Sequence, residues 1–171
     1  MRNSSPRGYA LLGLLIFLAI VALASASTLT LGSLMQQRTN ETELLFIGEQ
    51  YVRALQSYVA ATPVGQLPYP TRLEDLLHDP RYPGVRRHLR KIYVDPMTGK
   101  DDWVLVPAPT GGFLGVHSRS ALAPIKVAGF DTADADFADK KSYSDWVFTI
   151  TPNGSPGAIS AASLRAAMSR P

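Results

Sequence analysis

The chain has 171 residues, no cysteine and a formal net charge of +3. This length fits one modest domain with additional segments. The lack of cysteine excludes disulfides and thiolate-bound metals as sources of stability, and the small net charge does not indicate a nucleic-acid partner. The sequence has no phosphate-binding loop, dinucleotide fingerprint or metalloprotease helix motif. Because its three histidines are also scattered, no catalytic residues are predicted and the chain is not expected to be an enzyme.

The N-terminal part is apolar and carries no charge from Tyr9 to Gln37. Ten of the fourteen residues 11–24 are Leu, Ile, Val or Phe, which corresponds to about −3 to −6 kcal/mol of membrane-insertion free energy. A helix of roughly 20 residues crosses the apolar core of a bilayer. Arg2 and Arg7 precede the run without any acid, so we expect a transmembrane helix at 9–35 with a cytoplasmic N-terminus and an exported remainder.

Two other interpretations stay open for this segment. The small residues Ala24-Ser25-Ala26 fit a signal-peptidase site, which would give an exported soluble binding protein cleaved after Ala26. The chain could also be a single-span membrane protein that never polymerises. Against a signal peptide, the helical pattern continues beyond Ala26 as an amphipathic helix over 36–62. Its apolar positions are Leu44, Leu45, Tyr51, Val52, Leu55 and Val59, and its charged residues Glu41, Glu43, Glu49 and Arg53 fall largely on other faces.

The residues after this helix predict a small α+β domain over 63–152. Three prolines and a glycine in residues 62–70 end the long helix. Thr71 and Glu74 have capping-box spacing at the start of a second short helix, and a third helix is expected over 85–94. The motif DPMTG at 95–99 predicts a turn. Strands are expected at 103–106, 112–118, 124–130 and 145–150, which gives an α+β fold with an antiparallel sheet. Residues 153–171 are expected to form a loose tail.

The residues Arg7-Gly8-Tyr9, followed at once by ALLGLLIFLAIVALA, resemble the start of proteins of the type IV pilin and type II secretion pseudopilin superfamily. The stretch YPTRLEDLLHDPRYPGVRRHLRKIYVDPMTGKDDWVLV, with GVHS and YSDWVF after it, is similar to a subgroup of secretion-type pseudopilins. The resemblance covers roughly residues 7–150. It implies a pilin-like fold, a leader at 1–8 that prepilin peptidase removes after Gly8, and N-methylation of Tyr9.

The same resemblance implies a structural, minor pseudopilin of a type II secretion system or a related type IV pilus-like machine. Such a subunit is a single-pass protein of the bacterial inner membrane with its globular part in the periplasm. Its partners are prepilin peptidase, other pseudopilins, the inner-membrane assembly platform and membrane lipid. Most members carry a glutamate at the fifth mature position, which is Gly13 here, and this difference favours a minor subunit. The assembly positions are Leu12, Gly13, Leu15 and Ile16.

Two charged clusters are candidate sites. The basic residues are Arg86, Arg87, Arg90 and Lys91, with Arg81 and His88 nearby. They form either a solvated helix face or a contact surface for acidic patches on neighbouring subunits, and no nucleic acid is expected. The acidic residues are Asp131, Asp134, Asp136 and Asp139. Clustered carboxylates can hold Ca²⁺, but the spacing is not that of an EF-hand, and a solvated acidic loop is the alternative. No other cofactor is expected.

Overall fold

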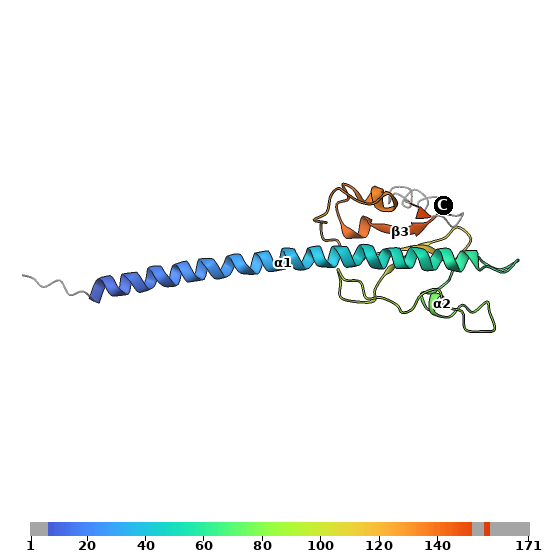
Figure 1. Ribbon diagram of the computed structural model, residues 1–171, viewed down its shortest axis with the longest axis horizontal. Helices are drawn as coiled ribbons and strands as arrows, with labels where there is room; N and C mark the ends of the chain where they lie inside the picture. Colours follow the sequence, from blue (N-terminus) through green and yellow to red (C-terminus); the bar gives the residue numbers. More distant parts are fainter. Residues whose placement is uncertain (1–6, 152–155, 158–171) are drawn as a thin grey trace, which may run out of the picture. The chain divides into compact units, whose positions relative to one another are not determined.

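One long α-helix, α1, runs without interruption from Arg7 to Ala60 (Figure 1). The computed structural model describes residues 7–151 and 156–157. Within these ranges it describes only the backbone of residues 7–8, 22–32, 133 and 156–157. The chain divides into two units, Met1–Arg38 and Thr39–Pro171. We call the second unit the head. The predicted continuation of the apolar helix into an amphipathic one is therefore confirmed as a single helix.

The head combines the second part of α1 with short helices and a small sheet, so the α+β class is confirmed. Helix α2 spans Glu74–Leu77, and the 3-10 helices η1 and η2 span Thr132–Phe137 and Tyr143–Asp145. The strands are β1 (Val104–Pro107), β2 (Phe113–His117), β3 (Val147–Ile150) and the two-residue β4 (Pro156–Gly157). They form an antiparallel sheet in the order β1-β2-β3-β4. In Figure 1, β3 and α2 lie on opposite sides of α1.

The core of the head lies between α1 and the sheet. Leu44, Tyr51 and Leu55 are fully buried at helical spacing, as their periodicity predicts. Phe148 of β3 packs so closely against α1 that a Cβ at Gly48 would overlap its ring. Glycine at this position therefore sets how near the strand approaches the helix.

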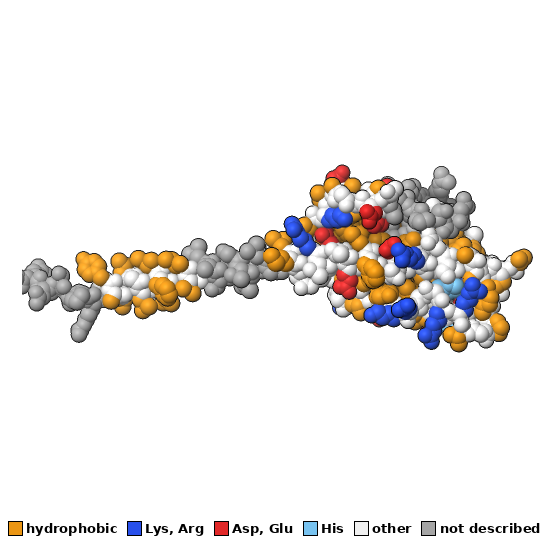
Figure 2. All heavy atoms as spheres, viewed as in Figure 1, with side chains coloured by type: hydrophobic (Ala, Val, Ile, Leu, Met, Phe, Trp, Pro, Cys, Tyr) orange, Lys and Arg blue, Asp and Glu red, His pale blue; other side chains and the backbone are white. Residues whose placement is uncertain are grey.

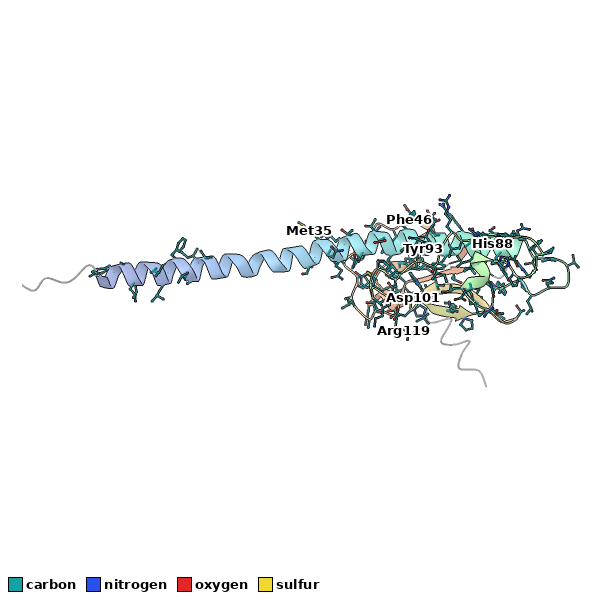
Figure 3. All side chains as sticks on the ribbon, turned by 90° about the horizontal axis from the view of Figure 1, so that it is seen from below. Met35, Phe46, His88, Tyr93, Asp101 and Arg119 are labelled. Atoms are coloured by element: carbon teal, nitrogen blue, oxygen red, sulfur yellow. The ribbon has the colours of Figure 1, made fainter. Side chains whose placement is uncertain are left out.

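The helix predicted over residues 85–94, after α2, does not form. The backbone N–H groups of His88 and Leu89 both donate to the carbonyl of Leu76, each at 2.9 Å, instead of to carbonyls of their own segment. Further along, the backbone N–H of Tyr93 donates to the Tyr51 hydroxyl at 3.2 Å. The segment is thus an extended loop held against α2 and α1, and Figure 3 shows His88 and Tyr93 along α1.

Two smaller predictions also need correction. Residues 124–130 form a loop instead of a strand. The capping box of Thr71 and Glu74 does not form, because Asp75 takes its place at the start of α2. The Asp75 carboxylate accepts hydrogen bonds from the backbone N–H groups of Thr71 and Arg72 and from the Thr71 hydroxyl, at 2.8–3.0 Å. The other three predicted strands correspond to β1, β2 and β3.

Candidate functional site

The N-terminal stretch of α1 presents an apolar surface. Every side chain from Tyr9 to Val21 is exposed, and the large apolar ones are between 45% and 80% exposed. Figure 2 shows hydrophobic side chains over this part of the helix. A helix that is apolar on all sides is normally buried in a protein core or a membrane, and apolar patches of this kind mark interaction sites. This stretch is therefore a candidate interaction surface.

The predicted assembly positions lie on this surface. Leu12, Leu15 and Ile16 are each more than half exposed, and a Cβ added at Gly13 would meet no atom within 4 Å. Gly8 and Ala26 belong to α1, but their surroundings lie outside the described residues, as does the leader up to residue 6. Within the residues that are described, no helix is both long and apolar enough to cross a membrane.

A buried carboxylate, Glu41, fastens the later loops of the head to α1. Its Oε1 accepts hydrogen bonds from the backbone N–H groups of Ile125 and Lys126, at 2.6 and 3.0 Å, and from the Tyr143 hydroxyl at 2.9 Å. The residue is only 5% exposed, and a buried charge is tolerated when it is hydrogen-bonded in this way. The sequence prediction that Glu41 lies off the buried face is therefore wrong. These bonds also occupy two of the backbone N–H groups that a strand over 124–130 would use for pairing.

A second buried network joins the C-terminal end of α1 to the loop after α2. The Arg81 guanidinium donates to both oxygens of Asp79, at 2.8 and 2.7 Å. It also donates to the Tyr58 carbonyl and the Thr62 hydroxyl, each at 2.8 Å, and lies 3.5 Å from the centre of the Tyr58 ring. The last carbonyls of a helix lack intrahelical partners and favour a nearby cation. Arg81 therefore caps α1 and does not belong to the basic surface predicted from the sequence.

The Asp79 and His88 side chains complete this network. Burial alone raises the pKa of Asp79, but the hydrogen bonds from Arg81 and His88 outweigh it and lower that pKa to about 2. Burial lowers the pKa of His88, although Asp79 opposes the shift. A neutral His88 ring donates from Nε2 to Asp79 Oδ2 at 3.2 Å and accepts at Nδ1 from the Ser57 hydroxyl at 2.8 Å. This arrangement has no signal in the sequence, because its members lie on separate segments.

The order serine–histidine–aspartate also occurs in catalytic triads, but the geometry here favours a structural role. The His88 side chain is 1% exposed and that of Asp79 is fully buried. Arg81 already occupies both carboxylate oxygens of Asp79. The network therefore fastens the loop to α1. The other two histidines take no part in it: His117 Nδ1 contacts the carbonyl of Ser118 at 2.9 Å, and His78 borders a hollow on the surface.

The turn at 95–99 forms as predicted and is anchored by its aspartate. The backbone N–H of Met97 donates to Asp95 Oδ1 at 2.8 Å, and Gly99 adopts a positive φ of 71°. The Ser118 hydroxyl donates to Asp95 Oδ2 at 2.6 Å. Since Asp95 is fully buried, the turn is tied to the residues that follow β2. The motif therefore has a structural role in this chain.

The basic residues remain a candidate contact surface. Arg86, Arg87, Arg90 and Lys91 are all exposed. The Arg86 guanidinium lies 4.5 Å from the Tyr82 ring centre, and the Lys91 ammonium lies 5.1 Å from that of Tyr93. Arg87 and Arg90 border a hollow of about 320 Å³ with Val85, which is itself exposed. The hollow thus combines positive charge with apolar surface. That it contacts another subunit stays a prediction.

The structure does not gather the four aspartates into a metal site. Asp131, Asp136 and Asp139 are exposed and Asp134 is half-buried. Within the described part of the chain, no group of three or more His, Cys, Asp or Glu side chains could hold a metal ion. Burial and the nearby charges of Asp131 and Glu49 raise the pKa of Asp134. The segment thus carries excess negative charge beside α1.

A groove of about 400 Å³ lies in the head between α1, η1 and β3. Its apolar lining includes Phe46, Val52 and Phe148, and its charged lining includes Asp131 and Asp134. Phe46 is 56% exposed, which is unusual for a large aromatic side chain beside a core. The groove could not be predicted from local sequence patterns, because its walls come from segments about 100 residues apart.

Comparison with protein-family models, with curated proteins and with solved structures finds no match to this chain.

Proposed function

We propose that the chain is a structural subunit of pilin type, a minor pseudopilin of a type II secretion system or a related type IV pilus-like machine. The observation that carries the proposal is the single helix α1. Its N-terminal stretch is apolar and exposed, whereas its later part forms the centre of a folded head. In this proposal the apolar stretch sits in the inner membrane before assembly and packs against the same stretch of neighbouring subunits afterwards.

The position of Arg7-Gly8-Tyr9 supports the proposed processing. A cut after Gly8 would remove the basic leader and leave the apolar helix attached to the head. A cut after Ala26 would separate most of the apolar residues from the head. Prepilin peptidase, the assembly platform, other pseudopilins and membrane lipid are the partners that this function requires. The pilin-like arrangement of long helix and small sheet belongs to the same proposal.

Gly13 supports a minor position. A charged carboxylate within the bilayer costs about 2.5–3.5 kcal/mol unless it is paired. A subunit with glycine at this position avoids the cost, gives up pairing with a neighbour's terminal amine, and allows close approach of another helix. These properties suit a subunit that occupies few places in the filament, with the head in the periplasm.

A matched pair of variants tests the proposal. The full chain is expressed in a bacterium with and without prepilin peptidase, and its size is followed on gels. Gly8→Leu should block the peptidase-dependent shortening, whereas Ala26→Leu should leave it unchanged. The reverse pattern, in which only Ala26→Leu blocks shortening, would establish signal-peptidase cleavage because that enzyme requires small residues at its site. No shortening in either host would favour a plain single-span protein.

A further inference from the structure

The direction of β4 leads the chain toward the groove in the head. Strand β4 pairs antiparallel with β3, with Pro156 opposite Ile150 and Gly157 opposite Thr149. Continued pairing in this register would place residue 158 beside Phe148 and residue 159 beside Val147. Both of these β3 residues line the groove. A chain that kept this pairing beyond Gly157 would therefore start at the groove and run along it.

Among the described residues, the apolar side of the groove is left partly exposed, and its lining carries excess negative charge. Phe46 is 56% exposed, and the acidic residues at the groove are Glu49, Asp131 and Asp134. Of the two basic residues there, Arg53 already pairs with Glu49, and the ammonium of Lys126 lies 4.7 Å from the Phe130 ring centre. An occupant of matching chemistry would bring apolar side chains and positive charge.

The sequence of residues 158–171, AISAASLRAAMSRP, has this chemistry. Leu164 and Met168 are four residues apart, so they would share one face of a helix. Arg165 and Arg170 supply positive charge, and the segment has no acidic residue. Even as a helix, the fourteen residues would be about 20 Å long. The groove extends about 16 Å along α1, from Leu45 to Gln56. The segment is therefore long enough to cover it.

We propose that residues 158–171 of the same chain dock in the groove between α1, η1 and β3. Leu164 and Met168 cover Phe46 and Val52, and Arg165 and Arg170 face Asp131 and Asp134. The segment forms the outer wall of the head at this place. The inference stands apart from the proposed function, because it concerns only the head.

Disulfide trapping tests the proposal directly, since the natural chain has no cysteine. Gln56→Cys is combined with Leu164→Cys, or with Met168→Cys, in the full chain purified in detergent. Docking should give an intramolecular disulfide with at least about fivefold higher yield than the control pair Val85→Cys with Leu164→Cys, because docking raises the effective concentration of the two thiols. Val85 is an exposed residue at a separate hollow.

Two results would overturn the proposal. One is a yield no higher than that of the control pair, and the other is a disulfide that forms only between chains, which would assign the groove to a second copy. A second measurement uses the single variant Gln56→Cys. Leu164→Asp together with Met168→Asp should raise its alkylation rate by at least about threefold and leave that of Val85→Cys unchanged, because an undocked segment no longer shields the thiol. An unchanged rate at Gln56→Cys would also contradict docking.

Discussion

The Asp79–Arg81 pair allows a quantitative prediction for the stability of the head. Replacing Asp79 with Asn keeps the size of the side chain but removes the negative charge that Arg81 contacts at 2.7 Å. Lowering the Asp79 pKa from 3.8 to about 2 corresponds to about 2 kcal/mol of stabilisation of the charged form. Arg81 is also left without its buried counter-charge, which raises the cost. We expect Asp79→Asn to lower the free energy of unfolding by about 2–4 kcal/mol at pH 7.

The sign of the pH dependence follows from the lowered pKa. The contribution of Asp79 is fully present above pH 3.8 and is lost as the pH falls toward about 2. The difference between the natural chain and Asp79→Asn should therefore narrow over this interval. Urea unfolding followed by tryptophan fluorescence measures it in the full chain, since Trp103 and Trp146 are both buried in the head.

The exposed Asp101 provides the matched control (Figure 3). Asp101→Asn should change the free energy of unfolding by no more than about 0.5 kcal/mol. The reasoning would be refuted if Asp79→Asn behaved like this control at pH 7. It would also be refuted if the difference between the natural chain and Asp79→Asn stayed constant from pH 4 to pH 2.

Three further predictions concern Glu41, Gly48 and Gly13. Glu41→Ala removes the acceptor of three hydrogen bonds, one of them buried, and should lower the free energy of unfolding by about 3 kcal/mol. The exposed Glu43→Ala should have little effect, and equal urea midpoints for the two variants would contradict the role of Glu41. Gly48→Ala should destabilise the head by about 1–3 kcal/mol because its Cβ meets the Phe148 ring, and Gly13→Ala, which meets nothing, should leave head unfolding unchanged. Gly13→Glu should insert and assemble only beside a subunit whose terminal amine can pair with it, so normal assembly in a strain without other pseudopilins would argue against pairing.

The parts of the fold that follow local patterns could be predicted from the sequence. The apolar periodicity of α1 and the β-branched and aromatic runs of β1 and β3 fix the type of each element. Residues 85–94 also show helical spacing, but their N–H groups bond to the carbonyl of Leu76 instead. A tertiary hydrogen bond of this kind leaves no local signal, so the pattern alone gave the wrong element.

The polar contacts could not be predicted for a related reason. Glu41 accepts hydrogen bonds from residues 84 to 102 positions away in the sequence. Asp79 accepts hydrogen bonds from Arg81 and His88, which lie in a loop whose sequence predicts a charged helix face. The sequence shows that these residues are charged but not that they are buried. The apolar surface of α1, by contrast, was predictable, because an uncharged run at helical spacing needs no distant partner to be recognised.

The mature N-terminus tests the proposed function most directly. The protein would be purified from membranes, and its intact mass and first residue determined. We predict a chain that starts at Tyr9 and carries one N-terminal methyl group, with α1 intact as far as the head. A soluble chain that starts at Ser27 would contradict the pilin-type assignment and would favour an exported soluble protein whose head binds a ligand.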